Sequence, residues 1–153
     1  FWQEQGWPVF KQGDAPRHQL ISRFRSQVHS VLFATDSFWE GVDVPGEALS
    51  CVILVKLPFR VPTEPVVEAR VEEMEKAGRN SFGEYMLPQA VLKFKQGFGR
   101  LIRGSEDCGS VVIMDRRVLQ KSYGQVFLDS LPECSRVSGS VEEVCERIES
   151  WLR

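Results

Sequence analysis

The chain has 153 residues, of which 42% are apolar and 26% are charged, and its formal net charge is −2. These values are typical of one globular domain with a buried core, and the charge argues against a protein that binds polyanions over its whole surface. No run of about 18 apolar residues occurs, so the sequence predicts no membrane span. The N-terminus, Phe1-Trp2-Gln3-Glu4, resembles neither a signal peptide nor a translation start, so we expect a piece of a longer protein.

Four cysteines are scattered along the chain: Cys51, Cys108, Cys134 and Cys145. They form no C-x-x-C pair, and neither histidine lies at ligand spacing to them, so we expect no zinc or iron–sulfur site in this chain. Cys51 and Cys108 flank apolar runs and are predicted to be small core residues or strand-end residues. Free buried thiols are typical of a reducing compartment, so we expect a cytoplasmic protein.

The first part of the chain alternates predicted strands and helices. A short strand is expected near residues 8–10, and Asp14 stands where it would cap a helix over Ala15–Gln27. Val31–Thr35 and Cys51–Val55 are apolar runs without alternation, as expected for parallel strands that are buried on both faces.

The remainder of the chain continues the alternation. The expected elements are a helix over Val66–Ala77, a long helix from Tyr85 to Arg103, a third buried strand over Val111–Met114, a helix within Ser122–Ser130, a short strand at Arg136–Val137 and a helix over Ser140–Leu152. Ser140 is the predicted cap of the last helix, with Glu143 at the capping-box position. This order predicts a three-layer α/β domain with a mostly parallel sheet flanked by helices.

Polar residues and glycines crowd the segment that follows the strand at residues 31–35. Residues 36–46 read Asp-Ser-Phe-Trp-Glu-Gly-Val-Asp-Val-Pro-Gly. In parallel α/β folds, functional groups gather in loops at the carboxyl ends of strands. This loop is therefore a predicted functional site.

The predicted long helix has two distinct faces. Four residues follow i, i+3, i+4, i+7 spacing and fall within roughly 100° of arc: Gln96, Gly99, Arg100 and Arg103. The opposite side is apolar: Leu87, Ala90, Val91, Phe94, Phe98, Leu101 and Ile102. Two guanidiniums beside an amide supply the planar, permanently charged, multidentate donors that a polyphosphate requires. The alternative is an amphipathic surface helix with a solvated basic face.

Two common catalytic motifs are absent from the sequence. No G-x-x-x-x-G-K-[ST] segment occurs, so the chain cannot cradle a triphosphate by itself through a P-loop. No G-x-S-x-G segment occurs either, which disfavours a serine hydrolase.

Two segments together resemble a known family. Residues 35–46, Thr-Asp-Ser-Phe-Trp-Glu-Gly-Val-Asp-Val-Pro-Gly, and residues 96–103, Gln-Gly-Phe-Gly-Arg-Leu-Ile-Arg, resemble motifs V and VI of superfamily-two helicases. With Lys-Leu-Pro-Phe at residues 56–59 between them, the match looks like the DinG/XPD-type ATP-dependent DNA helicases and extends over roughly residues 8–132. The resemblance implies that residues 1–153 are a single RecA-like domain, the second motor domain, and that the N-terminal ATP-binding domain lies outside this chain.

The resemblance also implies roles for individual residues and ligands. Gln96, Arg100 and Arg103 would be catalytic, the two arginines as fingers on the γ-phosphate. The nucleotide-binding residues implied by the family are Glu40, Gly41, Asp43 and Gly99, and the residues implied to contact the DNA backbone are Thr35 and Ser37. The complete enzyme would hold ATP and Mg²⁺ mainly through its other motor domain and would move 5′ to 3′ on single-stranded DNA.

Several residues also have plainer interpretations. Asp43 would then only turn the loop, Phe38 and Trp39 would pack rather than stack on bases, and Lys93 and Lys95 would be solvated. The tryptophans at positions 2, 7 and 151 are expected in the core. At the level of function, the alternative is a catalytically inert, stand-alone module that binds nucleic acid or a partner protein. A Walker A motif upstream on the same polypeptide would favour the helicase, and its absence would favour the module.

Overall fold

The computed structural model describes residues 4, 6–39, 44, 48–102 and 108–152. Its strands are β1 (Val9–Lys11), β2 (Val31–Phe33), β3 (Cys51–Leu54) and β4 (Ser110–Ile113). Its α-helices are α1 (Arg17–Ser26), α2 (Pro65–Lys76), α3 (Leu87–Phe98), α4 (Arg117–Gln120), α5 (Gly124–Asp129) and α6 (Val141–Leu152). A 3₁₀ turn, η1 (Asp36–Trp39), follows β2, and a π-helical turn, η3 (Phe82–Met86), leads into α3.

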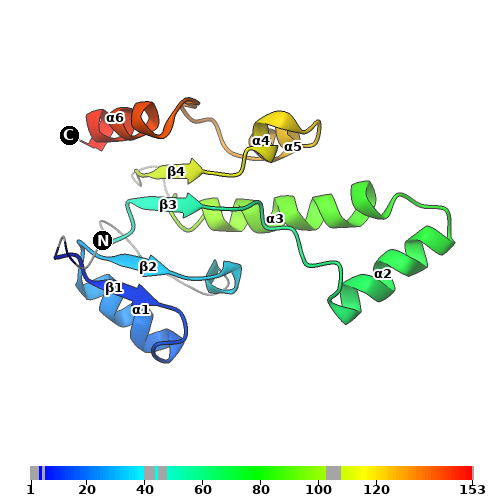
Figure 1. Cartoon of the computed structure of the whole chain (residues 1–153), viewed down its shortest axis with the longest axis horizontal. Coiled ribbons are helices and arrows are strands. Elements are labelled where there is room, and N and C mark those ends of the chain that lie inside the picture. Colours follow the sequence, from blue (N-terminus) through cyan, green and yellow to red (C-terminus); the bar gives the residue numbers. More distant parts are fainter. Residues whose placement is uncertain (1–3, 5, 40–43, 45–47, 103–107, 153) are drawn as a thin grey trace.

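The strands pair in parallel, as the alternation of strands and helices predicts. β1 pairs with β2, with Val9 opposite Val31, and β3 pairs with β4, with Cys51 opposite Ser110. In the described residues these pairs form two two-stranded sheets, and all four arrows point to the same side in Figure 1. The α/β class with parallel strands is therefore confirmed, and the carboxyl ends of the strands share one side of the molecule.

The larger core lies between α3, α5 and the β3–β4 sheet. Its buried members are Leu54, Leu57, Ala90, Phe94, Val118 and Phe127. Phe94 and Phe127 are fully buried and meet edge to face, with their ring centroids 5.3 Å apart. Such aromatic pairs stabilise a fold beyond the area they bury, by about 1 kcal/mol. This packing fixes one face of α3 against the strands.

A second core lies between α1 and the β1–β2 sheet. Its buried residues are Leu20, Phe24, Phe38 and Val44. Phe38, which belongs to η1, is only 7% exposed, so the prediction that it is a packing residue is confirmed. The side chain of Trp39 lies outside the described residues.

Asp115 ties together the ends of β3 and β4. Its carboxylate accepts hydrogen bonds from the backbone N–H of Leu57 at 2.8 Å and from the Arg117 guanidinium at 2.6 Å. The hydrogen-bonded Arg117 holds the pKa of Asp115 far below its usual range. The guanidinium carbon of Arg117 also lies 5.5 Å from the ring centroid of Phe59, so this pair holds the loop after β3 in place.

Burial of the strands and of some aromatic residues departs from prediction. Cys51 and Ile53 on β3 are exposed, because α3 covers only one face of this sheet and alternate side chains point to the other. All four cysteines are exposed, so the prediction of buried thiols is wrong, but Cys51 is the first residue of β3, which confirms the strand-end alternative for this residue. Trp7 and Trp151 are 42% and 53% exposed and do not belong to either core, so their assignment to the core is also wrong.

The ends of the helices give a mixed result. The capping box of α6 is confirmed, since the Ser140 N–H donates to Glu143 at 2.7 Å and the Glu143 N–H donates to the Ser140 hydroxyl at 3.3 Å. Asp14 does not cap α1, because Pro16 occupies the cap position and the Asp14 N–H closes a turn onto Lys11. Residues 136–137 form no strand in the structure. Within its described residues, the chain has no helix that is long and apolar enough to cross a membrane.

Candidate functional site

α3 is amphipathic, as its sequence predicts. Ala90, Phe94 and Phe98 are buried on the core side, and Gly97 is buried with them. Gln96 and Arg100 are half-buried, and Lys95 is exposed. The predicted core face therefore fixes the helix and leaves Gln96 and Arg100 partly exposed, although the Nε atom of Arg100 is itself buried.

The C-terminal end of α3 is shorter than predicted. The helix ends at Phe98 and not at Arg103, with Gly99 as its cap. Beyond it the chain continues as turns, in which the N–H of Arg100 donates to Gly97 and the N–H of Leu101 donates to Phe98. Gly97 and Gly99 explain this ending, because glycine costs about 1 kcal/mol relative to alanine inside a helix. The predicted continuation of the helix through residues 99–102 is therefore wrong, and Arg103 lies outside the described residues.

A polar network lies at the carboxyl ends of β1 and β2. The side-chain oxygen of Gln12 accepts hydrogen bonds from the backbone N–H of Thr35 at 2.8 Å and from its hydroxyl at 2.9 Å. The hydroxyls of Thr35 and Ser37 are 2.8 Å apart, and the Gln12 amide nitrogen donates to Ser37 at 3.3 Å. Both residues predicted to contact DNA thus belong to one hydrogen-bonded cluster.

Sequence reasoning missed Gln12, although a usable signal was present. The pairing of β1 with β2 continues past the strands, because the Gln12 N–H donates to the Phe33 carbonyl at 2.9 Å. Gln12 therefore stands at the carboxyl end of a parallel strand, next to the end of β2. The rule that singled out the loop after β2 applies equally to this position.

An ion pair joins this loop to α3. Lys93 donates to the Asp36 carboxylate at 2.5 Å, and the two side chains are 22% and 39% exposed. Asp36 lies between Thr35 and Ser37, and Lys93 precedes Gln96 by about one helical turn. The prediction that Lys93 is simply solvated is therefore wrong. The contact brings the segment of the first predicted motif against the helix that carries the second.

Four predicted site residues lie outside the described part of the chain: Glu40, Gly41, Asp43 and Arg103. Among the others, Thr35 and Ser37 lie together, and Gln96 and Arg100 lie at the C-terminal end of α3. In Figure 1 this end lies near the carboxyl ends of the strands. Gly99 is exposed at the same helix end.

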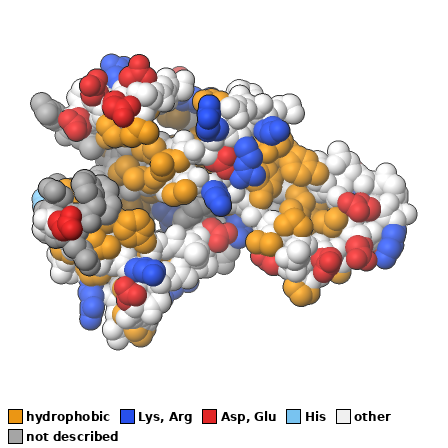
Figure 2. Space-filling model, in the orientation of Figure 1, with side chains coloured by type: hydrophobic (Ala, Val, Ile, Leu, Met, Phe, Trp, Pro, Cys, Tyr) orange, Lys and Arg blue, Asp and Glu red, His pale blue; other side chains and the backbone are white. Residues whose placement is uncertain are grey.

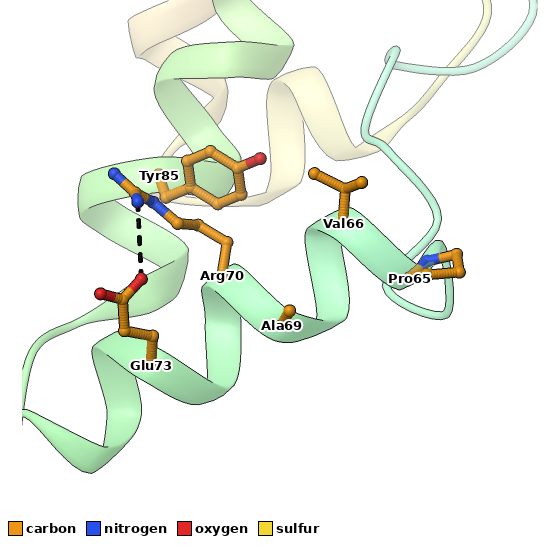
Figure 3. A pocket seen from close by; sticks show the side chains of 6 residues that line it. All are labelled: Pro65, Val66, Ala69, Arg70, Glu73 and Tyr85. Atoms are coloured by element: carbon orange, nitrogen blue, oxygen red, sulfur yellow. Dashed lines mark hydrogen bonds and ion pairs between the residues drawn. The ribbon is translucent and has the colours of Figure 1, made fainter.

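The surface shows no broad charged site on the side seen in Figure 2, where blue and red side chains are interspersed among apolar ones. A shallow hollow on α2 is lined by Pro65, Val66, Ala69, Arg70, Glu73 and Tyr85. Figure 3 shows Arg70 turned toward Glu73, and their ion pair spans 3.5 Å. None of the predicted site residues lines this hollow, so it is separate from the candidate site. The described residues contain no group of three or more metal-ligating side chains.

Comparison with known proteins gives a consistent result. A family model described as "Helicase C-terminal domain" matches residues 1–134. The chain is 48% identical over 128 residues to the "ATP-dependent DNA helicase YoaA" of Haemophilus influenzae, covering 84% of the chain and 20% of that protein. It is 45% identical over 117 residues to the "3'-5' exonuclease DinG" of Bacillus subtilis, covering 76% of the chain and 13% of that protein. It is 43% identical over 135 residues to the "ATP-dependent DNA helicase DinG" of Photobacterium profundum, covering 86% and 20%.

Proposed function

Because the chain belongs to the helicase C-terminal domain family, we propose that it is the second motor domain of a DinG-like, ATP-dependent DNA helicase. The chain spans about one fifth of the length of the helicases reported above, 20% in two of them. The complete protein then supplies an N-terminal motor domain with a P-loop, and ATP and Mg²⁺ bind between the two domains. Residues 1–153 form one domain of that protein, which works in the cytoplasm.

The observation that carries this proposal is the contact between the first motif segment and the helix that carries the second. The Asp36–Lys93 ion pair joins the loop after β2 to α3, so that groups suited to DNA phosphates and groups suited to nucleotide phosphates lie on two elements in direct contact. A motor domain needs this arrangement, because hydrolysis must be linked to movement along a strand.

On the nucleotide side, Arg100 and Arg103 act as arginine fingers and Gln96 orients the attacking water or contacts the γ-phosphate. Preorganised guanidiniums stabilise the charge that develops on a transferring phosphoryl group. Four residues line the nucleotide in this proposal: Glu40, Gly41, Asp43 and Gly99. The exposed position of Gly99 at the end of α3 is compatible with this role.

On the DNA side, Thr35 and Ser37 contact the phosphates of a single strand. Hydroxyl-to-phosphate hydrogen bonds carry no base information, which suits an enzyme that must step along any sequence. We propose that the complete enzyme moves in the 5′ to 3′ direction along the single strand.

Strand displacement by the complete protein tests the proposal. The substrates are partial duplexes with either a 5′ or a 3′ single-stranded overhang, with and without ATP. ATP-dependent displacement only from the 5′ overhang is expected. Displacement only from the 3′ overhang would overturn the polarity, and the absence of both displacement and DNA-stimulated ATP hydrolysis would favour an inert binding module.

A further inference from the structure

We infer that Gln12 is a third DNA-phosphate-binding residue and that Ser37, rather than Thr35, presents the hydroxyl proton to the phosphate. This inference rests on the proposed function, and it deepens the DNA side of the site. It follows from counting donors and acceptors in the cluster formed by Gln12, Thr35 and Ser37.

The orientation of the Gln12 amide is fixed by the backbone. A backbone N–H can only donate, so the Gln12 atom that lies 2.8 Å from the Thr35 nitrogen must be the carbonyl oxygen. The amide nitrogen therefore faces Ser37, which it reaches at 3.3 Å. A flipped amide would set two donors against each other.

The hydroxyl proton of Thr35 is used in a hydrogen bond to the Gln12 amide oxygen. This hydroxyl donates to the Gln12 oxygen at 2.9 Å, and that oxygen then has both lone pairs occupied, by the N–H and the O–H of Thr35. In the 2.8 Å contact between the two hydroxyls, Ser37 is then the donor. The three side chains close a ring in which each one donates to the next.

The ring leaves two donors for an incoming phosphate. One is the second N–H of Gln12, which has no recorded partner among the residues that the structure describes. The other is the Ser37 hydroxyl, whose release breaks only its own bond to Thr35 while Ser37 still accepts from Gln12. Release of the Thr35 proton would instead break the bond to the amide that orients the cluster. Ser37 and Gln12 together therefore form a neutral two-donor site, with Thr35 as its anchor.

The location of the cluster fits this role. It lies at the carboxyl ends of two adjacent parallel strands, where ligands bind in α/β folds. Thr35 and Ser37 are exposed and Gln12 is half-buried, so a backbone phosphate can reach all three.

The test uses the complete helicase and a fluorescently labelled oligo-dT strand, with affinity read by anisotropy. Gln12→Glu keeps the acceptor for Thr35, removes both N–H donors and adds a negative charge, so we expect affinity to fall about tenfold or more. Gln12→Leu and Ser37→Ala should each lower affinity severalfold. Because Gln12 and Ser37 are uncharged, these two variants should keep the wild-type slope of log K against log salt. Gln19→Glu is the matched control, because Gln19 is exposed on α1 and outside the ring, and its affinity should match the wild type.

The outcomes separate three cases. If Gln12 only braces Thr35, Gln12→Leu will cause no further loss of affinity in a Thr35→Val background, and the inference is overturned. Wild-type affinity in Ser37→Ala together with a large loss in Thr35→Val would overturn the assignment of the donor. A wild-type protein that binds no single strand at all would instead refute the proposed function, which distinguishes the two failures.

Discussion

Lys93 and Asp36 are 57 residues apart in sequence, yet their side chains meet at 2.5 Å and join α3 to η1. Both side chains are partly withdrawn from water, at 22% and 39% exposure. Partial burial reduces the screening that makes most surface ion pairs weak. This pair is therefore a direct physical connection between η1 and the helix that carries the second motif segment.

The first prediction is an energetic coupling between these two residues. In a double-mutant cycle with Asp36→Asn and Lys93→Met, followed by urea unfolding, we expect a coupling energy of about 1 kcal/mol. The control cycle uses Glu72→Gln and Lys76→Met, since that pair spans 3.1 Å on α2 but is 58% and 77% exposed. Its coupling should stay near 0.3 kcal/mol. Equal coupling in both cycles would show that Lys93 is an ordinary surface charge.

The second prediction concerns the pH dependence of Asp115. Its pKa is lowered in the folded state, so the carboxylate stabilises the fold fully above about pH 5 and loses this effect as the pH falls below about 4. Asp115→Asn should cost about 2 kcal/mol of unfolding free energy near pH 7, because charged hydrogen bonds are lost beside a side chain that is only 9% exposed. The difference from wild type should shrink in acid.

Urea midpoints measured from pH 7 down to pH 3 check this behaviour. Asp129→Asn is the control, because Asp129 is exposed on α5 and far less involved in the packing. A difference between Asp115→Asn and wild type that stays constant over the whole pH range would contradict the role of the charge.

The third prediction uses the close approach of α4 and α5. A Cβ atom at Gly124 would lie 2.0 Å from the carbonyl oxygen of Val118, which is backbone and cannot move aside cheaply. Gly124→Ala should therefore destabilise the chain by about 1–3 kcal/mol, although alanine normally favours a helix. Thermal unfolding is the measurement, with Gln120→Ala on the exposed side of α4 as a control that should change little. If the Gly124→Ala variant unfolded at a higher temperature than the wild type, α4 and α5 could separate easily, and the prediction would be wrong.

The features that could be predicted depend on residues close together in sequence, whereas most of the features that could not be predicted depend on residues far apart in sequence. The strands, the core face of α3 and the capping box of α6 follow from periodicity and from neighbours a few residues apart. The Asp36–Lys93 pair could not be predicted in this way, because a lysine on the polar side of a helix looks the same whether it is solvated or paired. The helix end at Phe98 was not predicted, because the apolar pattern continues through Leu101 and favours a longer helix. Two glycines, Gly97 and Gly99, oppose this by the free-energy cost of glycine inside a helix.

The site shows the same division. The loop after β2 was predictable from its position at a strand end, and the position of Gln96 opposite the core was predictable from helical spacing. The partial burial of Gln96 and Arg100 was not predicted. The ring formed by Gln12, Thr35 and Ser37 depends on the register between β1 and β2, which sets Gln12 beside Thr35. Register is a tertiary property, since short strands can pair in several alignments.

The fourth prediction is that this chain alone hydrolyses no ATP and binds single-stranded DNA weakly. The sequence has no P-loop, its net charge is −2, and basic side chains are dispersed among acidic ones on the face seen in Figure 2. Few phosphates are then neutralised, so the slope of log K against log salt should be shallow. Phosphate release with and without single-stranded DNA, and anisotropy titrations at two salt concentrations, measure both properties. Turnover comparable to that of a complete helicase, or submicromolar affinity at physiological salt, would contradict it.

The fifth prediction concerns Arg100 and Arg103 in the complete enzyme. Fingers stabilise the transition state more than bound ATP, so alanine at either position should lower kcat strongly, by about 10³-fold or more, and change ATP affinity much less. Lysine should not restore activity, because an ammonium keeps the charge but lacks the planar fork of donors. DNA-stimulated phosphate release gives kcat, and nucleotide titration gives affinity.

Thermal unfolding of the same variants separates catalysis from packing. Arg100 is half-buried beside the end of α3 and takes part in interactions there, so a structural arginine at this position would reveal itself by an earlier melting transition when replaced by alanine. Lys95→Ala is the matched control, because Lys95 is an exposed cation on the last turn of the same helix, and it should keep both the parental kcat and the parental midpoint. If the arginine is a finger, its alanine variant has a lower kcat and an unchanged melting midpoint. If the arginine is a structural ion-pair partner, its alanine variant has both a lower kcat and a lower melting midpoint. Parental turnover in both alanine variants would show that this end of α3 does not face the nucleotide, and the assignment of the catalytic face would then be wrong.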